Sequence, residues 1–213
     1  MEFLPEAIQE YVARHSDEES PLLARLNRET HAKVLAPRML SGHVQGRVLS
    51  MLSHMIRPKL VLEIGTYTGY SALCMAEGLA TDGKLITLDK NEELEAMVRG
   101  YISEAGLEAQ IDYRLGDAMA LIPEIDGPYD LVFIDADKIN YYNYFKLVVD
   151  KVRPGGFIIA DNVLWSGKVI ETEKKIDKDT QAIIDFNRLI DADDRVENVL
   201  FPVRDGLMVI RRK

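Results

Sequence analysis

The sequence predicts an α/β fold, in which a doubly wound and mostly parallel sheet follows an N-terminal helical layer. From residue 59 to residue 161, short apolar runs rich in Ile, Val and Leu alternate with stretches whose apolar positions recur at helical spacing. This alternation is typical of right-handed strand–helix–strand crossovers around a parallel sheet that is buried on both faces. The first 57 residues carry the helical period alone, which predicts helices without strands.

The N-terminal layer is predicted to contain three helices, over residues 3–14, 21–36 and 43–56, before Pro58 interrupts the pattern. A chain of 213 residues suits one domain of ordinary size. Because no repeat, low-complexity tract or Pro/Gly/Ser linker appears, we expect a single domain over residues 1–213, with residues 1–57 as the helical layer and residues 58–213 as the α/β core.

Seven strands are predicted in the core. Five are the apolar runs KLVLEI, KLITLD, IDYRLGD, DLVFID and GFIIAD, at residues 59–64, 84–89, 111–117, 130–135 and 156–161. Helices are expected between them at 70–80, 91–105 and 140–152, and a last helix is expected at 179–190. The final strands, 196–202 and 207–211, flank a turn at Asp205-Gly206 and are expected to pair as an antiparallel hairpin.

Composition excludes several classes of protein. The hydrophobic share of 47% and the charged share of 29% are those of a soluble globular protein, and no apolar run reaches the length of a membrane span. The net charge of −9 argues against broad binding to nucleic acid or to an anionic membrane. The single cysteine, Cys74, permits no internal disulfide, and the acidic N-terminus fits neither a secretory signal nor a transit peptide. We therefore expect a cytoplasmic protein in which Cys74 packs inside a helix.

Acidic residues gather at one edge of the predicted sheet. Four strands carry an acid at or next to their last residue, namely Glu63, Asp89, Asp135 and Asp161, and Asp117 lies at the end of another. In doubly wound sheets, ligands bind outside the carboxyl ends of the strands. The sequence therefore predicts a binding site at this edge.

The stretch VLEIGTYTGYSA, residues 61–72, predicts a strand, a glycine turn and the start of a helix. Gly65 and Gly69 allow the backbone to turn tightly and to approach a ligand. A dinucleotide fingerprint requires glycine where Tyr67 stands, and the carboxylate of Glu63 would repel a phosphate. A cationic or hydroxyl-bearing ligand fits this turn better, and the alternative is an ordinary strand-to-helix turn.

Asp89 follows Gly65 by 24 residues, near the spacing at which an acid reaches ribose hydroxyls in nucleotide-binding α/β folds. Asp117 and Ala118 follow the third strand and are placed to line an adenine pocket. Together these residues predict a nucleoside ligand without a phosphate tail, for which S-adenosylmethionine is the obvious candidate.

A possible metal site lies around FIDADK, residues 133–138, and the end of the fifth strand. Asp135 and Asp161-Asn162 offer oxygen ligands only, which suits Mg²⁺, Ca²⁺ or Mn²⁺ better than zinc. Lys138 lies one helical turn beyond Asp135, where it can act as a general base or as a fixed cation beside an oxyanion. Structural interpretations exist for the same residues: a helix cap for the aspartates, a turn for Asp161-Asn162 and a solvated lysine for Lys138.

The runs LEIGTYTGYS, DADKINYYNY, ADNVLWSGKV and PVRDGL resemble the cation-dependent O-methyltransferases of the caffeoyl-CoA and catechol type, in particular their bacterial members. The resemblance extends from about Met39 to the end of the chain. It implies a Rossmann-like class I methyltransferase fold and a homodimer. It also implies metal-assisted methyl transfer from S-adenosylmethionine to a hydroxyl of a small aromatic acceptor of the catechol or caffeoyl type.

The resemblance also implies roles for individual residues. Asp135, Asp161 and Asn162 match the metal ligands, and Lys138 matches the proposed catalytic base. Positions around S-adenosylmethionine are matched by Ser41, Glu63, Gly65, Tyr67, Ser71, Asp89, Ala118 and Asp135, with Asp89 on the ribose and Asp135 facing the amino group of the cofactor. Ser41 stands where the plant enzymes carry a threonine, which also has a hydroxyl.

The acceptor side departs from the plant pattern. After Trp165 the chain runs SGKVIETEKKIDKD, without the arginine- and tyrosine-bearing stretch that plant enzymes use for CoA. A smaller or different hydroxylated acceptor is therefore as well supported as a CoA ester. Trp165, Met39, Tyr141 and Tyr144 are candidates for the acceptor wall, with core packing as the alternative.

Three other functions compete with this one. A tRNA methyltransferase acting on a hydroxylated base would use the same metal, but the acidic total charge weighs against it. A non-catalytic S-adenosylmethionine-binding module would not need the complete set of Asp135, Asp161, Asn162 and Lys138. A nicotinamide-dependent oxidoreductase is disfavoured by Tyr67 at the second glycine of the fingerprint.

Overall fold

The computed structural model describes residues 4–171 and 176–213, which fall into two compact units. The C-terminal unit contains residues 60–65 and 118–213, and the N-terminal unit contains residues 4–59 and 66–117. This division does not follow the predicted boundary between a helical layer and an α/β core at residue 57, because the N-terminal unit also includes two strands. The single domain over residues 1–213 stays a prediction.

Three helices begin the N-terminal unit, as the sequence predicts: α1 (Glu6–Arg14), α2 (Pro21–Lys33) and α3 (Gly42–Ile56). Ser20 caps α2, since its hydroxyl accepts a hydrogen bond from the Leu23 N–H at 3.3 Å. The helix ends before residue 36, where the prediction placed its end, because Ala36 adopts a left-handed backbone immediately before Pro37.

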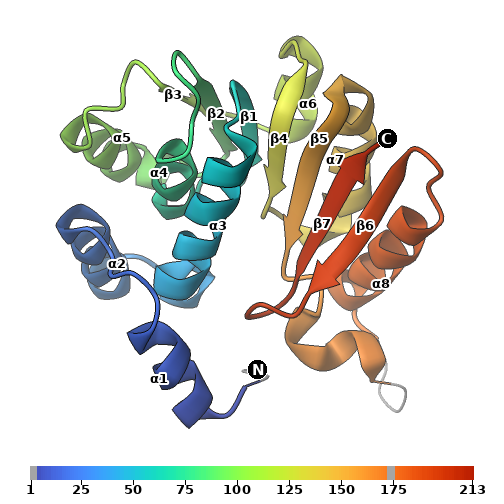
Figure 1. Cartoon of the computed structure of the whole chain (residues 1–213), viewed down its shortest axis with the longest axis horizontal. Helices are drawn as coiled ribbons and strands as arrows, with labels where there is room; N and C mark the ends of the chain where they lie inside the picture. Colours follow the sequence, from blue (N-terminus) through green and yellow to red (C-terminus); the bar gives the residue numbers. More distant parts are fainter. Residues whose placement is uncertain (1–3, 172–175) are drawn as a thin grey trace. The chain divides into compact units, whose positions relative to one another are not determined.

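Helix α3 packs against α4 (Tyr70–Ala76), and Figure 1 shows the two helices side by side. Gly46 permits this contact, since a Cβ there would lie 2.6 Å from Cε1 of Tyr70 and 2.8 Å from Sγ of Cys74. Cys74 is a free and buried thiol, and burial raises its pKa to about 12. Cys74 therefore packs inside a helix, as the sequence predicts.

The two strands of the N-terminal unit, β2 (Lys84–Asp89) and β3 (Ile111–Leu115), pair in parallel. A short 3₁₀ turn (Glu92–Leu94) and helix α5 (Glu95–Glu104) connect them. This is the strand–helix–strand crossover that the alternating pattern predicts.

The C-terminal unit holds five strands in the order β1-β4-β5-β7-β6. They are β1 (Leu60–Ile64), β4 (Tyr129–Ile134), β5 (Val152–Asp161), β7 (Leu207–Arg212) and β6 (Val196–Phe201). The first three run parallel, whereas β7 is antiparallel to both β5 and β6, which confirms the C-terminal hairpin (Figure 1). The full strand order is β3-β2-β1-β4-β5-β7-β6, so the predicted seven-stranded, mostly parallel sheet is confirmed.

Helices α6 (Ala118–Leu121), α7 (Tyr141–Val148) and α8 (Lys178–Asp191) complete the C-terminal unit, with α7 packed against α8. Strands β1, β4 and β5 carry its core, including the fully buried side chains of Leu62, Phe133 and Ile158. Within residues 4–171 and 176–213, no helix is long and apolar enough to cross a membrane.

Candidate active site

Two acidic residues lie at neighbouring strand ends in the C-terminal unit. Asp135 directly follows β4, and Asp161 ends β5. The parallel register pairs Ile134 with Ala160, so the two residues that follow this pair emerge at the same edge of the sheet. Asp161 is buried, and the Asp135 side chain is 20% exposed. The predicted meeting of these two strand ends is therefore present in the structure.

The Lys138 ammonium joins the two strand ends. Its Nζ donates to Oδ1 of Asp135 at 3.1 Å, to Oδ1 of Asn162 at 2.9 Å and to Oη of Tyr141 at 2.5 Å. Lys138 is only 8% exposed, which is inconsistent with a solvated lysine. Side-chain oxygens from the ends of β4 and β5 thus converge on one buried cation.

Tyr141 fixes this lysine from within the core. It is fully buried, its hydroxyl donates to the main-chain oxygen of Asp161 at 3.0 Å, and its ring contacts Phe186 edge-on at 5.5 Å. Burial, followed by the nearby carboxylates of Asp135 and Asp161, raises the pKa of Tyr141 well above its usual value. The phenol therefore keeps its proton and links Lys138 to the end of β5.

Two candidates for the acceptor wall belong to the core instead. Tyr141 is fully buried, and Tyr144 is 3% exposed and donates to Oδ1 of Asp137 at 2.6 Å. Sequence reasoning missed the link from Tyr141 to Lys138, although their spacing of three residues is the one at which helical side chains meet. Trp165 is a better wall candidate, since its ring centre lies 5.7 Å from the Lys138 ammonium. Met39, in the N-terminal unit, is exposed.

The residues predicted around a nucleoside fall in both units, and each unit is described by itself. In the C-terminal unit, Glu63 is fully buried in β1 and Ala118 begins α6. Gly65 has φ 101°, and a Cβ there would overlap the main-chain oxygen of Asp135. Only glycine fits this turn, as expected for a close approach of two backbones.

In the N-terminal unit, Asp89 fixes the continuation of the same turn. Its Oδ2 accepts the Tyr67 N–H at 2.7 Å, and its Oδ1 accepts the Asn91 N–H at 2.9 Å. Tyr67 has φ 51°, so this bond holds a non-glycine residue in a left-handed conformation. A carboxylate has about four acceptor positions, which leaves capacity for hydroxyl donors. Ser41 and Ser71 are both buried.

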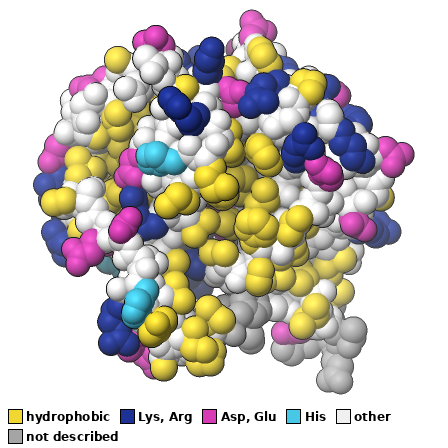
Figure 2. All heavy atoms as spheres, in the orientation of Figure 1, with side chains coloured by type: hydrophobic (Ala, Val, Ile, Leu, Met, Phe, Trp, Pro, Cys, Tyr) yellow, Lys and Arg dark blue, Asp and Glu magenta, His cyan; other side chains and the backbone are white. Residues whose placement is uncertain are grey.

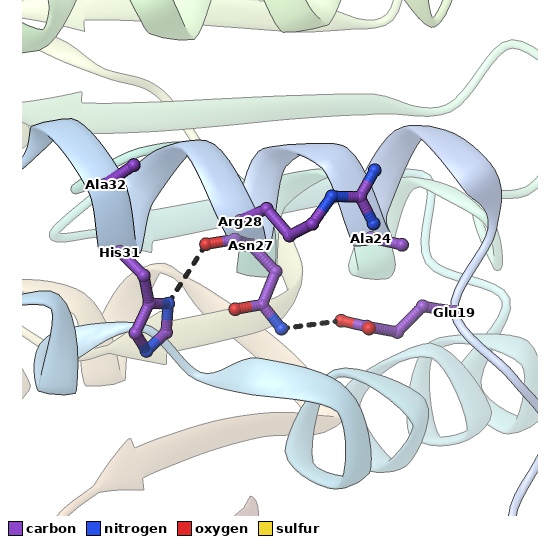
Figure 3. A pocket seen from close by; sticks show the side chains of 6 residues that line it. All are labelled: Glu19, Ala24, Asn27, Arg28, His31 and Ala32. Atoms are coloured by element: carbon purple, nitrogen blue, oxygen red, sulfur yellow. Dashed lines mark hydrogen bonds between the residues drawn. The ribbon is translucent and has the colours of Figure 1, made fainter.

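A separate hollow lies along α2 and contains none of the predicted site residues (Figure 3). It is lined by Glu19, Ala24, Asn27, Arg28, His31 and Ala32. The Asn27 amide donates to Glu19 at 3.1 Å, and Nδ1 of His31 lies 3.0 Å from the Asn27 carbonyl oxygen. Glu19, Asn27 and His31 are therefore already engaged in hydrogen bonds within this hollow.

Within the part of the chain that the structure describes, no three His, Cys, Asp or Glu side chains cluster as a metal site. The candidate set differs in composition, since it combines two carboxylates, Asp135 and Asp161, with one carboxamide, Asn162. Part of the acceptor-side stretch after Trp165, residues 172–175, lies outside the described residues.

Comparison with known families identifies the chain. The model of the O-methyltransferase family matches residues 13–213. The chain belongs to the O-methyltransferase family. The match begins well before Met39, so the family pattern extends further into the N-terminal helices than the motifs alone indicated.

Curated relatives of this O-methyltransferase include plant proteins. Caffeoyl-CoA O-methyltransferase 1 of Arabidopsis thaliana is 37% identical over 196 residues, which cover 87% of this chain and 76% of the relative. Caffeoyl-CoA O-methyltransferase 2 of Eucalyptus globulus is 38% identical over 196 residues, covering 87% and 79%.

Solved structures agree with this placement of the O-methyltransferase. The SAH-bound methyltransferase PaMTH1 of Podospora anserina superposes with a TM-score of 0.91 at 27% identity, covering 100% of this chain and 99% of that one. The O-methyltransferase of Bacillus cereus, in complex with SAH, gives a TM-score of 0.89 at 31% identity and covers 97% of both chains. The predicted class I methyltransferase fold is thereby confirmed.

Proposed function

We propose that this enzyme transfers the methyl group of S-adenosylmethionine to a hydroxyl of a catechol-like acceptor, with the assistance of a divalent cation. The observation that carries the proposal is the convergence of side-chain oxygens from Asp135 and Asn162 on the buried Lys138 ammonium. Asp161, directly before Asn162, adds a second carboxylate to the same edge of the sheet.

S-adenosylmethionine as the methyl donor is supported by the relatives and by this chain's own residues. The Podospora and Bacillus proteins hold SAH. In this chain, Asp89 is fixed by two backbone N–H groups and retains acceptor capacity for ribose hydroxyls. The side chain of Tyr67 replaces the glycine that a pyrophosphate requires. Ser41, Glu63, Gly65, Ser71 and Ala118 are proposed to line the same ligand.

The residues present fit a hard divalent cation. Asp135, Asp161 and Asn162 supply oxygen ligands only, which suits Mg²⁺ and alternatively Ca²⁺ or Mn²⁺. Asp135 and Asn162 already accept hydrogen bonds from one positive group, Lys138, so their oxygens are oriented towards a common cation. When bound, a divalent cation supplies positive charge that favours the ionised form of an acceptor hydroxyl and orients it.

The protein's own residues then accept the proton and position the reacting groups. A free phenol has a pKa near 10, so its proton must leave as the acceptor oxygen forms a bond to the methyl carbon and the carbon–sulfur bond breaks. Lys138 is proposed either to accept that proton as a neutral amine or to hold the oxyanion as an ammonium. The hydroxyl of Tyr141 accepts a hydrogen bond from Nζ of Lys138 and thereby fixes its position. Much of the rate should come from this positioning, since the sulfonium is already activated.

The acceptor is proposed to be a small aromatic molecule with neighbouring hydroxyls. The plant relatives are named for caffeoyl-CoA, whereas the resemblance leads us to expect that the run after Trp165 in this chain does not recognise CoA. On the face shown in Figure 2, lysine and arginine side chains lie among acidic ones. Together with the net charge of −9, this disfavours tRNA as the acceptor.

A homodimer in the cytoplasm is also proposed, as the resemblance implies. Exposed apolar side chains on α1 and α3, those of Ile8, Tyr11, Met51 and Met55, are compatible with a second copy. Sedimentation equilibrium tests this part: a monomer at all concentrations contradicts it.

Methyl transfer from labelled S-adenosylmethionine tests the proposal. The acceptors are a simple catechol, a caffeoyl ester and bulk tRNA, each with Mg²⁺ and with EDTA. Labelling of the catechol that EDTA abolishes is the expected result. Labelling of tRNA alone would move the same chemistry to RNA, and binding of S-adenosylmethionine without any transfer would favour a non-catalytic module.

A further inference from the structure

The PVRDGL run has no part in the proposed chemistry, yet the turn that it forms contacts the proposed site. This turn connects β6 to β7 and contains Asp205 and Gly206. It lies against residues 162–167, here named the wall segment, which follow β5 and carry both Asn162 and Trp165.

The wall segment has an unusual backbone. Asn162, Trp165 and Ser166 have φ values of 58°, 48° and 55°, and Gly167 has 80°. Left-handed backbone is uncommon for residues other than glycine and persists only where the surroundings impose it. The local sequence gives no reason for Trp165 and Ser166 to adopt it, so the cause must lie in contacts from elsewhere in the fold.

The β6–β7 turn supplies these contacts. Oδ1 of Asp205 accepts the Ser166 N–H at 2.6 Å, and the Asp205 carbonyl oxygen accepts the Leu164 N–H at 2.9 Å. The Gly206 carbonyl oxygen accepts the Val163 N–H at 3.2 Å. Gly206 has φ 88°, and a Cβ there would lie 2.6 Å from Cγ of Leu164. The turn therefore accepts hydrogen bonds from the N–H groups of Val163, Leu164 and Ser166, and of these three bonds the one to Ser166 uses the side chain of Asp205.

The wall segment in turn presents two groups to the proposed site. Oδ1 of Asn162 accepts from Lys138 at 2.9 Å, and the Trp165 ring centre lies 5.7 Å from the same ammonium. The indole Nε1 of Trp165 is buried and has no hydrogen-bond partner among the described residues. The orientation of this indole therefore depends on its backbone and its packing, since no hydrogen bond of its own fixes it.

We propose that Asp205 is a positioning residue for acceptor recognition: its carboxylate fixes the Ser166 backbone and thereby places Trp165 against the Lys138 ammonium. This inference rests on the proposed function, since it assigns the Trp165 wall to the acceptor. It predicts that loss of the carboxylate weakens recognition of the acceptor and leaves recognition of S-adenosylmethionine intact.

The test compares Asp205→Ala, Asp205→Asn and the control Asp193→Ala. Asparagine retains an Oδ1 acceptor for the Ser166 N–H. Asp193 makes the same kind of bond in the same unit, since its Oδ1 accepts the Arg195 N–H at 3.0 Å, but the bonds that it makes do not involve the wall segment. Trp165 is the only tryptophan of the chain, so intrinsic fluorescence and acrylamide quenching report on the wall segment without any ligand or activity.

In Asp205→Ala, the emission of Trp165 should shift and its acrylamide quenching constant should rise. The KM for catechol should rise roughly tenfold, which is the effect of one lost hydrogen bond. The KM for S-adenosylmethionine should stay unchanged. Asp205→Asn and Asp193→Ala should match the wild type. Wild-type emission and KM in Asp205→Ala, or the same changes in Asp193→Ala, would overturn the inference. If Asp205→Ala does not fold, Asp205→Ser replaces it with the same expected result. If the wild type transfers no methyl group, the proposed function fails, whereas the fluorescence comparison still tests the placement of Trp165.

Discussion

Replacing Lys138 with methionine tests whether the oxygens at the ends of β4 and β5 form a cation site. Methionine keeps most of the apolar stem but removes the ammonium and its three hydrogen bonds to Asp135, Asn162 and Tyr141. Breaking a fully buried ion pair costs about 3–5 kcal/mol. The Asp135 side chain is 20% exposed, so water solvates the remaining carboxylate and offsets part of this cost. We therefore expect the free energy of unfolding to fall by about 2 kcal/mol. For a chain of this length the midpoint of thermal unfolding should fall by roughly 4–8 °C.

Added Mg²⁺ makes this prediction specific. Because the ammonium repels a second cation on the same oxygens, Lys138→Met should bind Mg²⁺ at least as tightly as the wild type, while methyl transfer falls by about 10²–10⁴-fold. If the dissociation constant is about 1 mM, 10 mM Mg²⁺ should return about 1.4 kcal/mol of stability. Thermal unfolding with and without Mg²⁺ measures the loss of stability and its recovery. The control Lys146→Met, at an exposed position of α7, should change the free energy of unfolding by less than about 0.5 kcal/mol. A Lys138→Met protein that is as stable as the wild type, or that ignores Mg²⁺, would refute the reasoning.

Three further predictions address the turn at Gly65, the buried thiol of Cys74 and the hydroxyl of Tyr141, which contacts Lys138. Gly65→Ala, at φ 101° and against a main-chain oxygen, should lower the free energy of unfolding in urea by about 2–5 kcal/mol, whereas Gly100→Ala, with nothing within 4 Å, should not lower it. Burial raises the Cys74 pKa to about 12, so folding favours the thiol; the resulting stability is present at neutral pH and is lost as pH rises above the unfolded value near 8.5. Wild type should therefore lose roughly 2 kcal/mol more than Cys74→Ala between pH 8 and 10, and an equal loss in both would contradict the assignment. Tyr141→Phe should lower kcat roughly tenfold with little change in KM, while Tyr144→Phe, whose hydroxyl bonds elsewhere, should leave kcat unchanged.

Much of the fold could be predicted because strand and helix periods are local signals. Strands β2 and β4 match their apolar runs to within a residue at each end. Strand β5 begins at Val152 rather than residue 156, since Val152 pairs with Tyr129 across a register shift. Pro154 and Gly155 indicate a turn by their chemistry, but an irregular strand tolerates both. Only the pairing partner, which is distant in sequence, shows that the strand continues.

The site was predictable only in part. The meeting of the strand ends that carry Asp135, Asp161 and Asn162 was predictable, because the carboxyl ends of parallel strands lie at one edge of a sheet; their role as metal ligands stays a prediction. The hydrogen bonds of the Tyr141 hydroxyl to the Asp161 main chain and of the Asp205 carboxylate to the Ser166 main chain were not predicted, because each joins a side chain to a main-chain atom of a distant segment. Such contacts leave no periodic signal in the sequence, since a main-chain N–H or carbonyl is present at nearly every residue.

The central claim is that Asp161 helps to hold a cation which methyl transfer needs, while S-adenosylmethionine binds elsewhere. The most direct test is the rate of methyl transfer to catechol as a function of Mg²⁺ concentration, in the wild type and in Asp161→Ala, with binding of S-adenosylmethionine measured on the same samples. We expect saturable activation of the wild type by Mg²⁺, a loss of at least about 100-fold in the variant, and nearly unchanged cofactor binding. Transfer that is independent of Mg²⁺ in the wild type, or equal losses of activity and cofactor binding in the variant, would contradict it.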